Sequence, residues 1–528
     1  MNSRTAFCAT AALLALLPVV AGQPSVLSPE KFRPYVETFN REDEEVYRQE
    51  MPNERAWDFL RANIPWFECP DAEFERTYYF RWWTFRKHVR RTPDGYVITE
   101  FLPPVPWAGK HNAISCPAGH HFYEGRWLRE SRPLDDYAVF WFRQGGEPRR
   151  YSFWAADALW ARHLVTPNPA LLVDLLPDLI RNYEAWEGDR YDAPVGLFWQ
   201  DDGQDGMEVS NGGTGYRATL NSYQYGDALA IARIADLAGR AEVVGRFRAK
   251  ADRLKTLVQS LLWDEESQFF KVAPRRNATA PATDRLALAS ARELHGFTPW
   301  YFLMPDPRHD VAWKQLMDPK GFFAPFGPTT AEQRHPGFKV AYEGHECQWN
   351  GPSWPYATSI TLTALANLLN ARDPGVVTSR DYFTLLRQYA LSHRLQRPDG
   401  RTVPWIDENL NPFTGDWIAR TLLMQRGKVI PERGKDYNHS TFCDLVISGL
   451  VGLRPRADGT AVVNPLLPAD TWEYFCLDEV ACQGRRLTIL WDRTGARYGR
   501  GPGLRVLVDG KEAESRTDLG PLTIRLAK

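Results

Sequence analysis

Helical patterning across four hundred residues constrains this chain more than any other feature of its sequence. About a dozen segments between residues 52 and 452 place apolar side chains at helical spacing, and no fixed-length repeat relates them. A single ordinary core rarely serves more than about 300 residues. The pattern therefore predicts a mainly α-helical body with a large closed architecture. We expect its helices near residues 55–64, 73–90, 133–145, 150–164, 169–186, 219–238, 241–263, 284–302, 353–371, 377–394, 414–427 and 438–452.

The last seventy residues have a different pattern. Short runs at 487–491, 504–508 and 522–526 have β-type alternation, and Asp509-Gly510 is a hairpin turn signal. We therefore expect a small β-strand-rich unit packed on the helical body. The predicted order is a signal peptide (1–22), an N-terminal extension (23–50), the helical domain (51–454) and the β-unit (455–528).

The first 22 residues have the three parts of a secretory signal. Arg4 provides the positive start, residues 8–20 form an apolar run, and Val20-Ala21-Gly22 is a small-residue cleavage site. A buried N-terminal helix is the alternative. The sequence thus predicts a secreted or periplasmic protein with no membrane association after cleavage. Six cysteines would remain, and Cys476 with Cys482 is the expected disulfide.

The amino-acid composition limits the classes of function that fit this chain. Lys and Arg total 64 against 65 Asp and Glu, a net charge of −1, which disfavours a general nucleic-acid binder. Aromatic residues reach 13%, with 20 Trp. Indole rings serve both cores and the apolar faces of sugars, so a large core and carbohydrate binding both fit this content.

Three predicted loops combine carboxylates with aromatic residues ahead of a helix. They lie at residues 196–210, 346–355 and 405–417, within long loops of the kind that is usually functional. Hydrolysis of a glycosidic bond needs two carboxyl groups on opposite sides of the anomeric carbon, one protonated and one ionised. Such segments are also compatible with plain turns, a helix cap, core packing or, at Asp201-Asp202, a calcium loop.

Several motifs between residues 70 and 452 resemble the inverting (α/α)6-barrel glycosidases, near glycoside hydrolase family 63, mannosylglycerate hydrolase and the trehalases. The motifs are Asp205-Gly206-Met207-Glu208 with Arg217 and Asn221-Ser222-Tyr223, the stretch Trp349 to Pro355, the stretch Glu408 to Gly415, and His439-Ser440. The resemblance implies a six-hairpin (α/α)6 toroid and glycoside hydrolysis.

The resemblance also implies roles for individual residues. Asp205 matches the general acid and Glu408 the general base, with Glu208, Asp202 and Asp407 as competitors. The expected substrate-binding residues are Trp127, Glu124, Arg126, Glu208, Arg217, Trp349, Gly351, Trp354, Trp405 and His439.

The resulting hypothesis is a glycosidase that cleaves an α-linked sugar with inversion, with Asp205 protonating the leaving oxygen and Glu408 activating water. The alternatives are a polysaccharide lyase on a helical toroid and a non-catalytic carbohydrate-binding protein. A glycoside or oligosaccharide is the expected partner. No cofactor or metal is predicted, because no nucleotide fingerprint or metal-ligand spacing occurs; bound calcium is compatible with the acidic loops.

Overall fold

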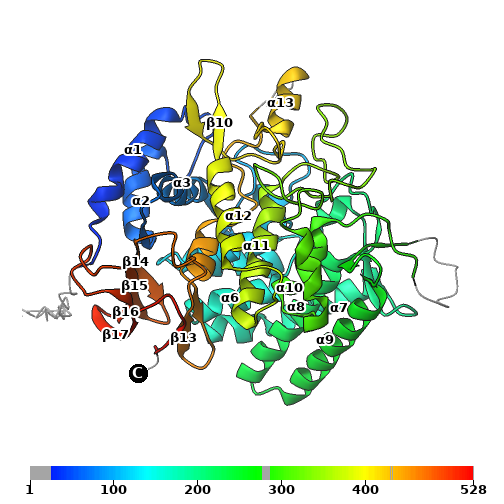
Figure 1. The fold of residues 1–528 in the computed structure, drawn as a ribbon. Helices are drawn as coiled ribbons and strands as arrows, with labels where there is room; N and C mark the ends of the chain where they lie inside the picture. Colours follow the sequence, from blue (N-terminus) through cyan, green and yellow to red (C-terminus); the bar gives the residue numbers. More distant parts are fainter. Residues whose placement is uncertain (1–24, 276–285, 428–429, 431, 527–528) are drawn as a thin grey trace, which may run out of the picture.

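The computed structural model describes residues 25–275, 286–427, 430 and 432–526. The predicted signal peptide, residues 1–22, lies outside this part of the chain. The helical body is an (α/α)6 barrel, as expected, and the C-terminal β-strands pack against one side of it (Figure 1). Among the described residues, no helix is long and apolar enough to cross a membrane.

The inner helices of the barrel are buried on almost every side. They include α3 (Ala72–His88), α6 (Ala155–Val165), α8 (Ala218–Leu237) and α11 (Pro355–Ala371). Small residues dominate the contacts of α11, among them Ala357, Ser359 and Ala364, which allow close helix approach. Pro355 occupies its first turn, where the missing N–H costs no hydrogen bond.

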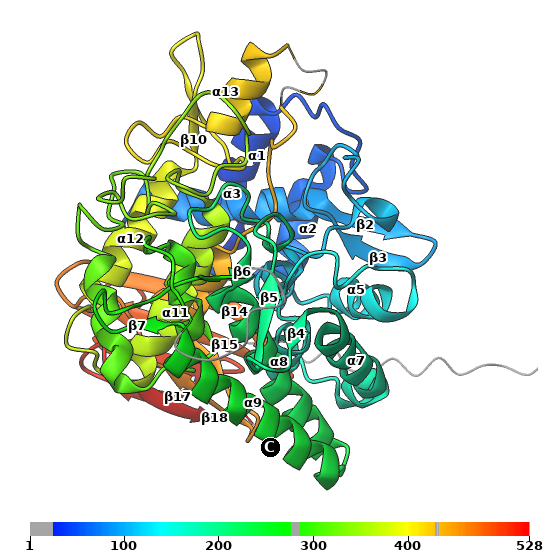
Figure 2. The ribbon, with the colours of Figure 1, turned by 90° about the vertical axis from the view of Figure 1, so that its right-hand side faces the viewer.

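The outer helices bury only one stripe each. They include α5 (Arg132–Arg143), α7 (Pro169–Arg190), α9 (Ala241–Leu261) and α12 (Ser379–Ser392). On α9 the stripe is Phe247, Ala251, Leu254 and Val258, and it packs on α8 (Figure 2). Helix α7 begins as predicted: Asn168 caps it by accepting the N–H of Leu171 at 3.1 Å.

Shorter elements complete the helical body. The helical ones are η1 (Pro29–Phe32), α1 (Arg33–Glu42), η2 (Asn53–Arg55), α2 (Ala56–Asn63), η3 (Lys110–Asn112), α4 (Ala118–Gly125), η4 (Gly203–Asp205), η5 (Leu294–Phe297), α10 (Thr298–Tyr301), η6 (Pro307–Gln315), α13 (Ile418–Gln425) and the π-helical turn η7 (Leu445–Leu450). The strands are β2 (Val89–Thr92), β3 (Gly95–Ile98), β4 (Tyr191–Asp192), β5 (Leu197–Gln200), β6 (Gly215–Tyr216), β7 (Trp263–Asp264), β8 (Phe269–Phe270), β9 (Ala273–Pro274), β10 (Arg394–Gln396) and β11 (Thr402–Pro404).

Two predicted helices are much shorter in the structure. Residues 286–293 are irregular and only η5 and α10 follow, because the N–H groups of Ala289 and Leu294 donate to Val272 and Thr330 instead of within a helix. The start of the predicted helix 284–302 lies outside the described residues. In the predicted helix 438–452 only η7 forms, and His439, which precedes it, lines a cavity described below.

The C-terminal unit contains two antiparallel sheets. One has the order β1-β14-β15-β16-β17, from β1 (Trp66–Glu68), β14 (Tyr474–Cys482), β15 (Arg485–Asp492), β16 (Gly503–Val508) and β17 (Lys511–Arg516). The other joins β12 (Leu453–Pro455), β13 (Thr460–Val463) and β18 (Leu522–Arg525). The predicted hairpin turn is present, since Asp509 and Gly510 have φ of 51° and 79° between β16 and β17. Strand β1 comes from the helical part of the chain, so the two units share a sheet.

The predicted disulfide between Cys476 and Cys482 is wrong. Both residues lie on the single strand β14, and all six cysteines described are free. Six residues of strand separate their Cα atoms by roughly 20 Å. A disulfide requires Cα atoms about 4.4–6.8 Å apart. Cys476 and Cys482 instead fill the core of the sheet as buried thiols.

Candidate active site

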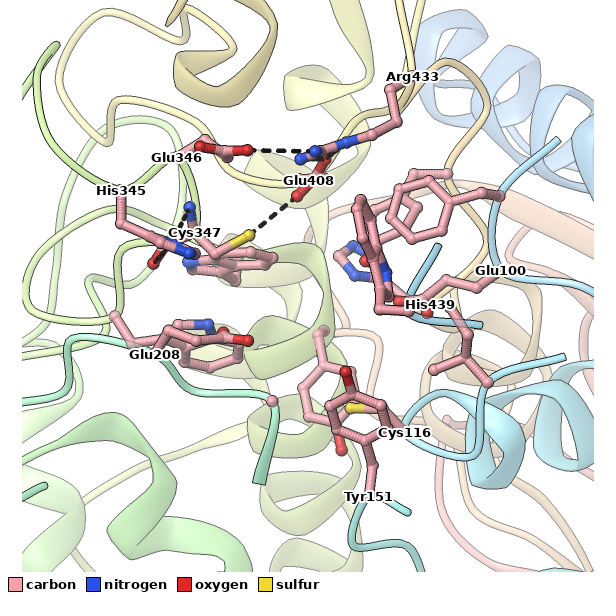
Figure 3. Close-up of a pocket in the computed structure, with 18 residues that line it drawn as sticks. Glu100, Cys116, Tyr151, Glu208, His345, Glu346, Cys347, Glu408, Arg433 and His439 are labelled. Carbon is pink, nitrogen blue, oxygen red and sulfur yellow. Dashed lines mark hydrogen bonds and ion pairs between the residues drawn. The ribbon is translucent and has the colours of Figure 1, made fainter. Parts of the chain in front are cut away.

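A cavity of about 250 Å³ opens among loops from all three acidic, aromatic segments (Figure 3). The first segment contributes Gly206 and Glu208, the second residues 346–354 and the third Glu408. The three segments, distant in sequence, therefore meet at one cavity. The lining residues are Glu100, Phe101, Trp107, Ile114, Cys116, Tyr151, Gly206, Glu208, His345, Glu346, Cys347, Trp349, Trp354, Tyr356, Glu408, Arg433, Tyr437 and His439.

Glu408 is the most firmly held carboxylate of the cavity. Its side chain is almost fully buried, and Arg433 donates to Oε1 through Nε at 2.9 Å and Nη2 at 2.5 Å. The thiol of Cys347 lies 3.2 Å from Oε2, and burial raises the pKa of that thiol well above its ordinary value, so it donates as S–H. Glu346 also pairs with Arg433, at 3.2 Å.

Glu208 faces the same cavity from the first loop. Figure 3 shows its carboxyl below that of Glu408, with the cavity between them. The backbone carbonyl of Glu208 accepts the N–H of Trp349 at 3.0 Å, which ties the first loop to the second. Burial, reinforced by the negative charge of Glu408, raises the pKa of Glu208 to about 7. The two carboxyl groups therefore have different environments, as acid–base chemistry requires.

Glu100 is a fourth carboxyl group in the cavity wall, beside Glu208, Glu346 and Glu408. The hydroxyl of Tyr437 donates to its Oε1, and the side chain is buried. Burial raises the pKa of Glu100 to about 8, although the hydrogen bond from Tyr437 opposes this shift. Glu100 is therefore mostly protonated at neutral pH and can donate a hydrogen bond.

An aromatic wall completes the cavity. Trp349 and Trp354 stack with ring centroids 4.7 Å apart, and Trp354 donates its indole N–H to the carbonyl of Gln348 at 2.7 Å. The indole N–H of Trp349 is buried with no acceptor among the described residues. His439 lies beside Trp354, and burial lowers its pKa well below the usual value, so the ring is neutral. Such a wall suits the apolar face of a sugar.

Asp205, the expected general acid, does not line the cavity. It forms a fully buried ion pair with Arg217, whose Nε lies 2.8 Å from Oδ2, and Thr219 donates to the same oxygen. The aspartate thus neutralises Arg217 behind the wall, at the start of α8. Neither member of this pair is among the residues that line the cavity, and Oδ1 of Asp205 is buried with no hydrogen-bond partner among the described residues.

Four other expected sugar contacts support the fold instead. Glu124 accepts backbone N–H groups from Phe442, Cys443 and Asp444. Arg126 and Trp127 both donate to Oδ1 of Asp444, at 2.7 and 2.6 Å. These contacts fix the chain ahead of η7, and none of the three expected residues lines the cavity. Trp405 lies outside it too and donates to Asp407 at 3.2 Å.

Gly351 is also absent from the wall, and its role is steric. A Cβ at this position would lie 2.2 Å from the carbonyl oxygen of Lys339. Only glycine allows these two chain segments to pack together. Of the expected site residues, Glu208, Glu408, Trp349, Trp354 and His439 are the ones that line the cavity.

Sequence reasoning missed much of the remaining wall. Glu100, Trp107 and Cys116 come from residues 100–116, which matched no motif, and Arg433 and Tyr437 precede a predicted helix. Glu100 had only the neighbouring Phe101 as a local signal, and Arg433 has no aromatic neighbour in the sequence. Among the described residues, no group of three or more His, Cys, Asp or Glu side chains is arranged to hold a metal ion.

An (α/α)6 barrel whose loops gather opposed carboxyl groups and stacked indoles into one cavity belongs to the class of glycoside hydrolases. A family model described as the mannosylglycerate hydrolase MGH1-like glycoside hydrolase domain matches residues 110–440, and the chain belongs to this family. A second model, the glycosyl hydrolase family 65 C-terminal domain, matches residues 453–515, which covers most of the β-unit.

Two solved structures illustrate the likeness. One titled "Sialidase" is 42% identical over 95% of this chain and 45% of its own, with a TM-score of 0.87. The chain therefore spans less than half the length of that protein. A GH78 family rhamnosidase of Bacillus SP. GL1 is 14% identical over 84% of this chain and 41% of its own, with a TM-score of 0.52, and shares the fold.

Proposed function

We propose that the chain hydrolyses an α-linked glycoside of an uncharged sugar with inversion, using Glu208 as general acid and Glu408 as general base. Glu208 gives its proton to the glycosidic oxygen as the bond to the anomeric carbon breaks. Glu408 accepts a proton from the water that attacks this carbon from the opposite face. One observation carries the proposal: the two carboxyl groups face one cavity, one with a raised pKa and one paired with Arg433.

Glu208 replaces Asp205 in this proposal because of what each carboxylate contacts. Asp205 is neutralised by Arg217 in a dry environment, and protonating it would leave that guanidinium without a counter-charge. Glu208 is half-buried, lines the cavity and titrates near neutrality. A general acid needs access to substrate and a pKa close to the working pH.

The charge of the cavity supports an uncharged substrate. Glu100, Glu208, Glu346 and Glu408 line it, and Arg433, already paired with two of them, is the only lysine or arginine on the wall among the residues that the structure describes. A uronate lyase needs free cationic groups around its substrate. The substrates implied by the names of similar proteins, sialosides and mannosylglycerate, also carry a carboxylate. We therefore expect neutral glycosides to be cleaved in preference to either.

The α-configuration and exo-type action rest on the resemblance of the motifs to six-hairpin enzymes. Export rests on residues 1–22 alone. Expression with the native N-terminus, followed by mass spectrometry of the exported chain, tests the cleavage after Gly22. A cytoplasmic chain of full length would contradict export.

The decisive experiment follows the anomer of the first product by NMR. Neutral nitrophenyl glycosides and disaccharides of both anomeric configurations are screened for cleavage. For a substrate that is cleaved, the configuration of the first sugar released is recorded before mutarotation. Inversion predicts a β-product from an α-glycoside. A product of retained configuration would favour retaining hydrolysis instead. An unsaturated product that absorbs in the ultraviolet would indicate a lyase, and binding without any sugar release would indicate a non-catalytic binder.

A further inference from the structure

One irregular segment, residues 432–439, carries three side chains of the cavity wall. Arg433 pairs with Glu408, Tyr437 donates to Glu100, and His439 lies beside Trp354. The backbone between them is unusual, since Asp436 has φ of +60°. Residues in this left-handed region persist only where the surroundings hold them. The placement of Arg433 on Glu408 therefore depends on whatever anchors this segment.

The anchors come from the N-terminal part of the chain. Lys435 donates to Oδ1 of Asp43, and Lys87 lies 2.7 Å from Oδ2 of Asp43 and 2.6 Å from Oδ2 of Asp436. His88 at the end of α3 contacts the carbonyl of Asp436 at 2.7 Å. Asp43 follows α1 directly, so it bridges the cavity segment to two helices nearly four hundred residues earlier.

The charges in this cluster balance. Asp43, Lys87, Lys435 and Asp436 are two anions and two cations, and each side chain is less than 8% exposed. Burial raises the pKa of Asp43, but the two lysines outweigh it and hold the pKa far below its usual range. Removing one anion would leave a buried lysine uncompensated, which costs several kcal/mol in typical proteins.

We propose that Asp43 is a positioning residue of the active site, which fixes residues 432–439 so that Arg433 stays on Glu408. The proposal rests on the assignment of Glu408 as general base. It extends the catalytic unit beyond residues 110–440, the range that matches the family model, because both Asp43 and Lys87 precede it. The N-terminal extension is then a functional part of the enzyme.

The first test compares Asp43→Asn with Glu44→Gln under native trypsin. Both variants remove one negative charge from the same stretch, but Glu44 is exposed and forms no ion pair with described residues. Arg433 and Lys435 are buried in the wild type, so trypsin should not cut after them. We expect Asp43→Asn to be cleaved there at least ten times faster, with Glu44→Gln unchanged. Equal resistance in both variants overturns the proposal.

The second test is the pH profile of kcat/KM on the substrate found by screening. A carboxylate whose guanidinium partner is displaced takes up a proton more readily. In Asp43→Asn we expect the acidic limb of the kcat/KM profile to move to higher pH. We also expect kcat to fall by a larger factor than KM rises. A fold that is merely weakened would lower activity without moving the limb. An unmoved limb together with wild-type kcat contradicts the positioning role.

A double variant guards against loss of folding. In Asp43→Asn/Lys435→Gln no lysine remains without its anion, so we expect more thermal stability than in Asp43→Asn alone. Trypsin cleavage after Arg433, the site that remains, and the shifted acidic limb should nevertheless persist, because the ion pair between Asp43 and Lys435 is absent. If the double variant regained the trypsin resistance and the pH profile of the wild type, Asp43 would act through stability only. Trypsin cleavage does not depend on catalysis, so a wild type that cleaves no glycoside refutes the proposed function without touching this result.

Discussion

Arg433 donates two hydrogen bonds to a single oxygen of Glu408, Oε1, and leaves Oε2 to the thiol of Cys347 and the cavity. This arrangement orients the carboxylate, and Oε2, which accepts from the Cys347 thiol, keeps a second lone pair that would receive a proton from water. Figure 3 shows the three side chains grouped at one end of the cavity. It is the arrangement expected of a general base.

Replacing this carboxylate should abolish most activity. We expect Glu408→Gln to lower kcat by about 10²–10⁴-fold, the usual contribution of a general base. Glu343→Gln, an exposed change on a neighbouring loop, should have no effect. Azide, which needs no deprotonation to attack, should restore turnover on an activated glycoside and give a glycosyl azide of inverted configuration. An active Glu408→Gln enzyme would remove Glu408 from the mechanism.

Glu208→Gln and Asp205→Asn should fail in different ways. Glu208→Gln should lower kcat by about 10²–10⁴-fold on glycosides with poor leaving groups and much less on dinitrophenyl glycosides, which need no protonation. Asp205→Asn leaves Arg217 buried without its partner, so we expect a loss of about 3–5 kcal/mol of stability. Calorimetry measures the stability loss of Asp205→Asn, and rates on a series of glycosides with different leaving groups measure the effect of Glu208→Gln. If the dependence on leaving group appeared in folded Asp205→Asn instead, the roles would be reversed.

The pH–rate profile should report the protonation of Glu208. Its raised pKa of about 7 means that the acid form, which donates the proton, is lost above this pH. We expect kcat/KM to fall tenfold per pH unit on the basic side, with a midpoint near 7 in the free enzyme. Dinitrophenyl substrates should show a weaker fall. A rate that stays constant to pH 9 on a poor leaving group would contradict the assignment.

Glu100 should make the protein less stable at higher pH. Its pKa of about 8 exceeds the unfolded value, so the folded state binds more protons and stability declines as pH rises from about 4.5 to 8. Glu100→Gln, which stays neutral, should flatten this decline in urea-unfolding free energy. Glu343→Gln serves as the control, because Glu343 is exposed. An identical decline in Glu100→Gln would refute the buried, protonated state.

The unpaired indole N–H of Trp349 should contribute to binding. Trp349→Phe keeps an aromatic ring on the wall but removes the buried donor. A hydrogen bond to a sugar hydroxyl typically contributes about 0.5–1.5 kcal/mol, so we expect KM to rise about 2–13-fold with little change in kcat. Trp127→Phe, away from the cavity, is the comparison. Unchanged KM in Trp349→Phe would show that this N–H does not contact substrate.

The helices and the broad function could be predicted from local patterns. The stripe of α9, the Asn168 cap and the Asp509-Gly510 turn are encoded within a few residues, so sequence spacing was sufficient. The motifs around Glu208, Trp349 and Glu408 were likewise continuous and identified the family. The two shortened helices were not predictable, because contacts with segments distant in sequence override local helical spacing. Ala289 and Leu294 donate to Val272 and Thr330, and Glu124 accepts the N–H groups of residues 442–444.

The choice of Glu208 as the proposed acid and the walls of the cavity both depended on tertiary contacts. Asp205 and Glu208 are three residues apart and have similar neighbours in the sequence. In the structure Asp205 is the buried counter-ion of Arg217, whereas Glu208 faces the cavity and has a raised pKa. Glu100, Arg433 and Asp43 have no motif; each acts through a partner distant in sequence. A one-dimensional pattern records which charges a chain carries, whereas burial and pairing in three dimensions determine which of them is protonated, held or free to react.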